Sequence, residues 1–261
     1  MRFASLGSGS RGNATLIQAG SGCLLVDCGY SVREFEARCA ELAVEPAAID
    51  AILVTHEHGD HLRGVGALAR KYRLPVWMTP GTCRAGRCGV LPELHLFSTH
   101  GASFRLAGIE VTPFPVPHDA REPAQFLFSH GGRRVGLLTD TGTITPHVAA
   151  RLDGVDALLL ECNHDEEMLR TGPYPPSLQA RVGGDFGHLS NRQAAELLTR
   201  LDSARLQHLV LGHLSEKNNH PELAIAAVLE QREGLEPVVS VLRQEGCSGW
   251  FSLGEHPAAT P

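Results

Sequence analysis

The chain has 261 residues, of which 43% are hydrophobic and 20% charged, and its formal net charge is -6. This length and composition suffice for one hydrophobic core, so we expect one domain. No apolar run is long enough to span a membrane, and the first residues lack the apolar segment of a signal peptide, which predicts a cytoplasmic protein without membrane contact. The acidic balance argues against an extended basic surface for nucleic acid but does not exclude a local one.

The seven cysteines are scattered and form no Cys-x-x-Cys pair. An odd number of separated cysteines is typical of free thiols in a reducing compartment. Cys83 and Cys88 are near enough in sequence for a disulfide or a metal site, which is the less favoured alternative.

Two strands joined by a loop of glycine and serine residues are predicted at the start of the chain, and a third strand ends at Asp27. The loop contains Ser8, Ser10 and Asn13, and its small residues let backbone amides approach an anion, although such loops are more often simple turns. A buried carboxylate at Asp27 either accepts an imidazole N–H from a metal-binding histidine or begins a turn.

The next strand runs into a cluster of histidines and acids with the sequence Ala-Ile-Leu-Val-Thr-His-Glu-His-Gly-Asp-His, residues 51–61. His56 and His58 are two residues apart, so in an extended segment both rings point the same way and can bind one metal ion. The following glycine permits a bend that turns Asp60 and His61 toward a neighbouring ion. The cluster therefore predicts a two-metal site. The alternative is that Asp60 caps a helix and that the histidines only occupy a polar loop.

Beyond the cluster we predict a helix over residues 62–72, an irregular segment over residues 80–108 and a strand over residues 109–114. Prolines follow this strand and lead to His118. A histidine held rigidly in this way suits a metal ligand better than a solvent-facing residue.

A hairpin comes next, and its second strand, residues 135–139, ends at Asp140. The following buried strand, residues 156–161, leads to His164. The stretch from there to residue 187 is rich in glycine and proline, and we expect it to be a mobile loop facing the substrate.

His188 opens the next predicted helix, and a strand over residues 209–211 ends at His213. A final helix, a last strand and a loose tail over residues 254–261 complete the chain, so the predicted domain covers residues 1–253. Because strand ends converge at one edge of an α/β sheet, the polar residues at these separate strand ends are expected to meet in one cleft.

The order His-x-His-x-Asp-His, followed by separate histidine, aspartate and histidine residues, resembles the metallo-β-lactamase-fold hydrolases. The resemblance covers residues 3–251 and implies an α/β fold, the αβ/βα four-layer sandwich. It also implies the ligands of each metal: His56, His58 and His118 for the first, Asp60, His61 and His213 for the second, and Asp140 as a bridge.

Two divalent ions in such a site would share a hydroxide whose pKa is lowered enough for it to attack a phosphodiester near neutral pH. Asp60 takes part in this chemistry through its ion. An acid on the opposite side must protonate the leaving oxygen, and either His188 or His164 could supply it; the alternative for each is a structural histidine. The mixed imidazole and carboxylate ligands suit zinc, manganese or iron.

Finer features favour one branch of this superfamily. His58 in place of a glutamate disfavours the flavodiiron oxidoreductases, and a bridging Asp140 disfavours the lactamases. The loop at residues 6–13, together with the segments that begin at His188 and His213, resembles the YycJ/WalJ (VicX) group. The chain has no room between residues 140 and 213 for the inserted domain of the β-CASP nucleases.

This resemblance implies a phosphodiester hydrolase, a 5′-to-3′ exonuclease acting on DNA rather than RNA. The implied substrate contacts are Ser8, Ser10 and Asn13 for a phosphate. Arginines are expected to line a groove, and the candidates are Arg63, Arg84, Arg87, Arg170 and Arg181. Two alternatives stay open: a small-molecule hydrolase, either a cyclic phosphodiesterase or a glyoxalase-II-like thioesterase, and a non-catalytic metal-binding or signalling protein. The sequence does not determine the oligomeric state.

Overall fold

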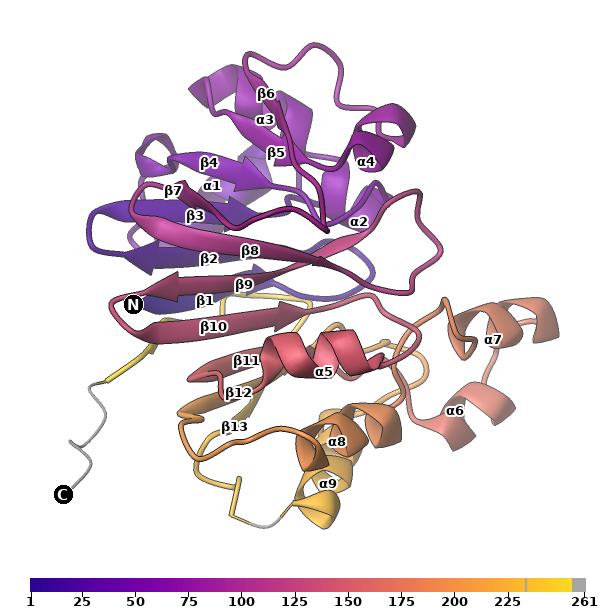
Figure 1. Cartoon of the computed structure of the whole chain (residues 1–261). Helices are drawn as coiled ribbons and strands as arrows, with labels where there is room; N and C mark the ends of the chain where they lie inside the picture. The colour runs from indigo at the N-terminus through magenta and orange to yellow at the C-terminus, as the bar shows by residue number, and fades with distance from the viewer. Residues whose placement is uncertain (233, 255–261) are drawn as a thin grey trace, which may run out of the picture.

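The computed structural model describes residues 1–232 and 234–254. Within these residues two seven-stranded sheets lie face to face, and helices cover the outer face of each sheet (Figure 1). This arrangement confirms the predicted αβ/βα four-layer sandwich. The predicted tail lies outside the described residues from position 255 onward, and the single domain expected over residues 1–253 stays a prediction.

The first sheet contains strands from the N-terminal part of the chain and one strand from its C-terminal end. Its order is β14 (Phe251–Ser252), β1 (Arg2–Gly7), β2 (Ala14–Ala19), β3 (Gly22–Val26), β4 (Ala51–Leu53), β5 (Val76–Met78) and β6 (Leu94–Leu96). Pairing is antiparallel from β14 to β3 and parallel from β3 to β6.

The second sheet contains the strands that lie between residues 104 and 241. Its order is β13 (Val239–Val241), β12 (His208–Gly212), β11 (Ala157–Glu161), β10 (Arg133–Leu138), β9 (Ala124–His130), β8 (Ile109–Pro115) and β7 (Phe104–Leu106). Pairing is parallel from β13 to β10 and antiparallel from β10 to β7. Because β8 and β10 are both antiparallel to β9, the strands β8, β10, β11 and β12 run in the same direction.

The outer layers are formed by helices of unequal length. The N-terminal half supplies α1 (Val32–Glu41), the 3-10 helix η1 (Pro46–Ala48), α2 (Gly59–Leu62), α3 (Val65–Tyr72) and α4 (Pro80–Ala85). The C-terminal half supplies α5 (Pro146–Leu152), α6 (Glu166–Thr171), α7 (Pro176–Val182), α8 (Asn191–Thr199) and α9 (Pro221–Gln231). Over the described part of the chain, no helix is long and apolar enough to cross a membrane.

Buried apolar side chains fill the space between each pair of layers. Leu24 of β3 belongs to the core between the sheets, whereas its neighbour Leu25 belongs to the core under α1 and α3. Leu159 and Leu158 of β11 divide in the same way between the central core and the core under α5 and α8. The central strands are therefore buried on both faces, which explains their continuous apolar sequence. Burial of each such side chain contributes about 1.5–3 kcal/mol.

The prediction of one continuous helix over residues 62–72 is wrong, because α2 and α3 are separate helices. The break lies at Gly64. A Cβ atom at this position would be 1.9 Å from the carbonyl oxygen of Tyr30, so the chain comes too close to its neighbour for any side chain. This packing contact links unrelated segments and has no local sequence signal.

The two stretches predicted to lack regular structure contain short elements instead. Residues 80–108 include α4, β6 and β7, and the expected mobile loop up to residue 187 includes α6 and α7. Thr79 caps α4 and Asp165 caps α6 through side-chain oxygens that accept a backbone N–H. Pro176 occupies the first position of α7, where a proline favours a helix start. Pro176 therefore begins a helix rather than belonging to a loop.

All seven cysteines are free thiols. No cysteine belongs to any of the groups of possible metal ligands found in the described residues. The disulfide alternative for Cys83 and Cys88 is therefore wrong, and the metal alternative stays untested.

Candidate metal centre

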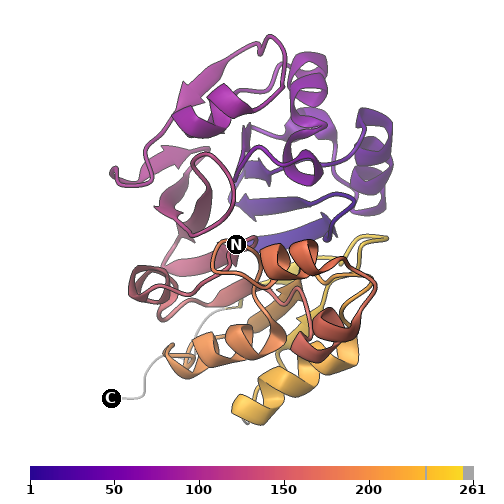
Figure 2. The same ribbon diagram turned by 90° about the vertical axis from the view of Figure 1, so that its right-hand side faces the viewer.

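Strand ends from both sheets carry polar residues to the same end of the sandwich. This end is on the right in Figure 1, near α2, α6 and α7, and faces the viewer in Figure 2. The first sheet contributes the residues after β3 and β4, and the second sheet contributes those after β8, β10, β11 and β12. Parallel strands share the edge at which their carboxyl ends lie, so each sheet delivers its set to one edge.

Three of these residues have a left-handed backbone one or two residues after the end of a strand. The φ angle is 60° at Asp27, 47° at Asp140 and 54° at His213. Such a conformation costs on the order of 1–3 kcal/mol for a residue other than glycine and persists only where neighbouring contacts hold it. The turn directs each side chain away from the strand and into the polar cluster.

The first donor group consists of His56 and His58, which follow β4, and His118, which follows β8. The ring centroids are 4.6 to 5.0 Å apart. Nδ1 of His118 donates to the carbonyl oxygen of Gly187 at 3.0 Å. Burial lowers the pKa of His118, which favours the neutral ring, and its Nε2 faces the donor group, 3.2 Å from Nδ1 of His58.

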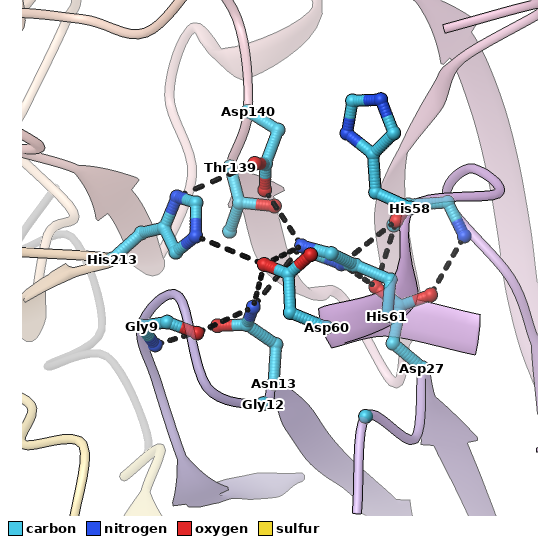
Figure 3. Close-up of polar contacts among 12 residues, drawn as sticks. Gly9, Gly12, Asn13, Asp27, His58, Asp60, His61, Thr139, Asp140 and His213 are labelled. Atoms are coloured by element: carbon cyan, nitrogen blue, oxygen red, sulfur yellow. Dashed lines mark hydrogen bonds and ion pairs between the residues drawn. The ribbon is translucent and has the colours of Figure 1, made fainter. Parts of the chain in front are cut away.

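The second donor group brings Asp60 and His61 of α2 together with Asp140 and His213 (Figure 3). Nε2 of His61 lies 3.1 Å from Oδ2 of Asp140 and 3.3 Å from Oδ2 of Asp60. Oδ1 of Asp140 is 3.9 Å from Nε2 of His118, so this carboxylate lies between the two groups. The structure thus brings together the seven residues assigned to two metals from the sequence, and their role as ligands stays a prediction.

The helix-capping alternative for Asp60 is wrong. His58 occupies the N-cap position of α2, and Asp60 lies within the first turn. The proposed role of Gly59 is also wrong, because this residue is helical, and a Cβ atom added to it would meet no atom within 4 Å. The start of the helix, rather than a special glycine conformation, turns Asp60 and His61 away from His58.

A buried carboxylate orients His61 from the side of its ring that faces away from the second donor group. Oδ2 of Asp27 accepts a hydrogen bond from Nδ1 of His61 at 2.8 Å. Thr55 fixes the same carboxylate by donating from its amide at 2.8 Å and from its hydroxyl at 2.7 Å. Nε2 of His61 is therefore the nitrogen that faces the second donor group. Asp27 occupies the orienting position that the sequence indicated.

Ser8 and Asn13 support the cluster and are buried. The hydroxyl oxygen of Ser8 accepts the backbone N–H of His213 at 2.8 Å, and the side-chain amide of Asn13 lies 3.2 Å from Oδ2 of Asp60. Neither side chain is open to a substrate. The predicted phosphate contact of this loop is therefore narrowed to Ser10, which lines the cavity over the cluster.

Glu161 was missed as a functional residue. Its carboxylate is fully buried, and Oε1 accepts from Nδ1 of His188 at 2.7 Å and from Nδ1 of His213 at 3.0 Å. Oε2 accepts the backbone N–H groups of Thr141 at 3.0 Å and Leu189 at 3.2 Å. The sequence contained a signal for Glu161, because this acid stands at the end of a buried strand, as Asp27 and Asp140 do.

The cluster attracts positive charge strongly. Burial lowers the pKa of His213, but the carboxylates of Asp140, Asp60 and Glu161 outweigh this effect and raise it to about 10. Burial also lowers the pKa of His61, and Asp140 and Asp60 again reverse the shift and raise the pKa well above its ordinary value. Four carboxylates thus stabilise positive charge in this cluster: those of Asp27, Asp60, Asp140 and Glu161. Bound divalent cations would supply such charge.

Specific atoms in both donor groups are also oriented to receive a ligand. Within the described residues, Nε2 of His56 is buried and lacks a hydrogen-bond partner. Nε2 of His213 and Oδ2 of Asp140 are buried too, and each has only an ion-pair contact, at 3.5 Å to Asp60 and at 3.1 Å to His61. Such groups are costly to bury unless something binds them. The donor set therefore fits metal ions.

Comparison with known proteins identifies the family. The family model described as a beta-lactamase superfamily domain matches residues 23–213. The chain belongs to this superfamily. The matched segment runs from β3 to the end of the candidate metal centre at His213.

Individual relatives in the superfamily agree with the resemblance seen in the sequence. The chain is 38% identical over 238 residues to exodeoxyribonuclease YycJ of Bacillus anthracis, covering 89% of this chain and 90% of that protein. It is 37% identical over 237 residues to exodeoxyribonuclease WalJ of Streptococcus pneumoniae, covering 88% and 87%. The solved structure of the metallo-beta-lactamase fold protein YhfI from Bacillus subtilis has a TM-score of 0.73 at 16% identity, covering 94% of this chain and 98% of that one, which shows a shared fold.

Two of the other predicted residues of this beta-lactamase superfamily member do not line the cavity over the metal centre. His164 and Arg170 line a separate cavity of about 480 Å³, and Arg170 is paired with Glu167. His188, in contrast, lines the cavity over the metal centre. Its contact with Glu161 occupies Nδ1 and leaves Nε2 as the nitrogen available to that cavity.

Arg181 lies at the edge of the centre. Its Nε donates to Oδ2 of Asp119 at 2.5 Å, and Oδ1 of Asp119 is 3.5 Å from Nε2 of His118. Asp119 therefore joins α7 to the loop that carries His118. Its role in linking these two segments was not predicted from the sequence.

The cavity over the metal centre has a volume of about 180 Å³. It is lined by Ser10, His58, Asp60, Asp140, Asn163, Tyr174, Val182, His188, His213, Leu214 and Ser215. Pockets for whole drug-sized ligands usually measure roughly 300–1,000 Å³. This space suits a reacting group, and the rest of a larger substrate must extend over the rim.

Proposed function

We propose that this protein is a metal-dependent nuclease that removes nucleotides from DNA in the 5′-to-3′ direction. The observation that carries the proposal is the pair of adjoining donor groups beneath a small cavity. Similarity to two exodeoxyribonucleases over 89% and 88% of the chain supports the choice of DNA.

The proposed cofactors are two divalent ions, held by the two donor groups with Asp140 between them. Imidazole and carboxylate ligands suit zinc or manganese, and iron is also compatible. Bound ions would lower the pKa of a water molecule toward neutrality and offset the charge of a phosphodiester. The protein's own contribution is to fix the ligands and to handle the proton on the leaving group.

The residues behind the ligands determine which nitrogen faces a metal. Asp27 accepts the Nδ1 proton of His61, and Glu161 accepts that of His213. Each contact makes Nε2 the nitrogen that faces the donor group, although in His61 this atom also lies 3.0 Å from the side-chain amide nitrogen of Asn13. Such supporting contacts commonly change metal affinity by about 10- to 100-fold.

His188 is the proposed general acid. Burial lowers its pKa, but the Glu161 carboxylate outweighs this effect and raises the pKa above its usual value, which favours a protonated ring. With Nδ1 held by Glu161, the Nε2 proton is the one that can pass to a leaving oxygen in the cavity. His164 lines another cavity, so we do not assign it this role.

A second cavity, of about 680 Å³, adjoins the centre and shares Ser10 with the metal cavity. Its lining includes three arginines and two glutamates, and of the arginines Arg11 is paired with Glu216 and Glu245 and Arg38 with Glu34. Of the arginines expected to line a groove, Arg63 is thus in a position to meet a neighbouring phosphate. Local basic residues of this kind are compatible with the net charge of -6 of the whole chain.

The test is hydrolysis of end-labelled single- and double-stranded DNA and RNA after chelation and addition of Mn²⁺ or Zn²⁺. We expect nucleotides to leave first from the 5′ end of DNA, RNA to react more slowly, and Asp60→Ala to abolish the reaction. Asp202→Ala is the matched control, because Asp202 is exposed and does not line the metal cavity.

The same assay separates the alternatives. Release from the 3′ end would contradict the proposed direction. Inert DNA together with rapid cleavage of a thioester or a cyclic phosphodiester would favour a small-molecule hydrolase. An Asp60→Ala variant that matched the wild type on every substrate would favour a non-catalytic protein.

A further inference from the structure

Asp119 lies beside the least buried histidine of the first donor group. The side chain of His58 is 30% exposed, whereas that of His118 is fully buried. Packing alone therefore constrains the ring of His118 more than that of His58. Oδ1 of Asp119 is 3.7 Å from Nε2 of His58. This carboxylate is thus in a position to set the orientation of the less buried ring.

The two nitrogens of the His58 ring have different surroundings. Nδ1 lies 3.2 Å from Nε2 of His118, and Nε2 faces Asp119. Zinc binds histidine nitrogens at about 2.0–2.1 Å, so two nitrogens on one tetrahedral ion lie about 3.4 Å apart. Nδ1 of His58 is therefore the nitrogen placed to share an ion with His118.

A neutral imidazole carries one proton, and the position of this proton decides whether His58 can bind an ion. With the proton on Nδ1, His58 donates to Nε2 of His118, and both nitrogens are occupied. With the proton on Nε2, Nδ1 is free to act as a ligand. An ionised carboxylate only accepts hydrogen bonds, so Asp119 favours the second arrangement. The carboxylates that contact His61 and His213 do the same through the opposite ring nitrogen.

Arg181 holds the Asp119 carboxylate through its other oxygen. Nε of Arg181 donates to Oδ2 at 2.5 Å, and the residue belongs to the last turn of α7. The end of α7 is itself fixed, because the carbonyl of Val182 accepts the N–H of His188 at 2.8 Å. The N–H of Asp119 donates to the carbonyl of Phe186 at 2.9 Å. The side chain and the backbone of Asp119 are therefore both tied to α7 and the loop that follows it.

We propose that Asp119 is a positioning residue for the first metal ion, and that Arg181 acts through it. The carboxylate keeps Nδ1 of His58 available to the ion, and the guanidinium keeps the carboxylate in place. The inference rests on the two-metal centre of the proposed function. Arg181, expected from the sequence to line a groove, thereby supports a metal ligand and couples α7 to the metal centre.

The test is titration of chelated protein with Co²⁺, in which bound ions are counted and the visible absorption per ion is recorded. The wild type should bind two ions. Asp119→Asn should weaken the binding of one of them by about 10- to 100-fold, because an amide can also donate to Nε2 of His58 and no longer keeps the proton there. The spectrum of the ion that remains should match that of His56→Ala, which lacks a ligand of the first donor group, and should differ from that of His213→Ala, which lacks one of the second.

A double-mutant cycle tests the part played by Arg181. Arg181→Gln should weaken the binding of the same ion. The variant that combines it with Asp119→Asn should bind this ion no more weakly than Asp119→Asn alone, because both changes remove one support. Glu167→Gln is the matched control. It breaks an ion pair of the same length, 2.5 Å, on the neighbouring helix α6 and should keep both affinities.

Wild-type affinity of Asp119→Asn for both ions, or an equal loss for both, overturns the inference. Losses that simply add in the double variant overturn the role of Arg181. A wild type that binds fewer than two ions overturns the inference together with the two-metal centre. A wild type that binds two ions and leaves DNA intact would instead contradict the nuclease function alone.

Discussion

Replacing Glu161 by glutamine changes one oxygen to an NH2 group in a site where every neighbour is a donor. The carboxylate accepts N–H groups from His188 and His213 on one oxygen and from Thr141 and Leu189 on the other. A glutamine amide offers one acceptor and one donor end. In either orientation, Glu161→Gln therefore places its NH2 group against two donors.

The two orientations have different consequences. If the NH2 group faces Thr141 and Leu189, two buried N–H groups lose their acceptor, which costs about 1–3 kcal/mol each in stability. If it faces the histidines, both rings must accept at Nδ1 and carry their proton on Nε2. His213 then cannot bind a metal through Nε2, and metal affinity falls by at least about 10- to 100-fold.

The assay is a paired measurement of metal affinity and unfolding free energy. We expect Glu161→Gln to lose stability by about 2–6 kcal/mol or to show the loss of metal affinity, with slower DNA cleavage in both cases. Glu166→Gln is the control, because Glu166 is 51% exposed and pairs with Arg192, so its effect should stay within about 1 kcal/mol. A Glu161→Gln variant with wild-type stability, metal affinity and cleavage would refute the assigned role.

Three other substitutions separate the proposed roles. Asp27→Asn should weaken metal binding by about 10- to 100-fold, because an asparagine amide can also donate to Nδ1 of His61 and so no longer keeps the proton on that nitrogen. Calorimetric titration measures the affinity, and an unchanged value would argue against orientation by Asp27. His188→Gln should lower kcat for DNA by about 10²- to 10⁴-fold with normal metal content, whereas His164→Gln should leave kcat almost unchanged; equal losses in steady-state kinetics would contradict the choice of acid. Ser8→Ala should destabilise the fold by about 1–3 kcal/mol in denaturant titration, since the N–H of His213 loses its buried acceptor, and a neutral result would count against that contact.

The parts of the fold that could be predicted from sequence have strong local signals. Buried strands followed by polar residues predicted where the edges of both sheets lie, and Asp27 was placed behind the histidines for that reason. The same argument applied to Glu161 but was not used, because a single acid outside a recognised motif gives no indication of its partners. The contacts of its carboxylate with two histidines depend on how β11 and β12 pair.

The errors occurred where distant contacts override local composition. Glycine and proline in residues 165–187 predicted a mobile loop, yet the segment contains two short helices that pack beside the centre. Ser8 and Asn13 were expected to meet a phosphate, and they instead hold His213 and Asp60. Side chains of similar polarity serve either purpose, and only the packing of β1 and α2 against the second sheet decides between them.

Counting bound metal against cleavage tests the central claim most directly. Chelated protein is titrated with Mn²⁺ or Zn²⁺, and the ions bound per chain are measured together with the rate of nucleotide release from 5′-labelled DNA. We predict little cleavage up to the first equivalent and a plateau at two ions per chain, which Asp140→Ala does not reach. Full cleavage with one ion or none would contradict the proposed two-metal centre.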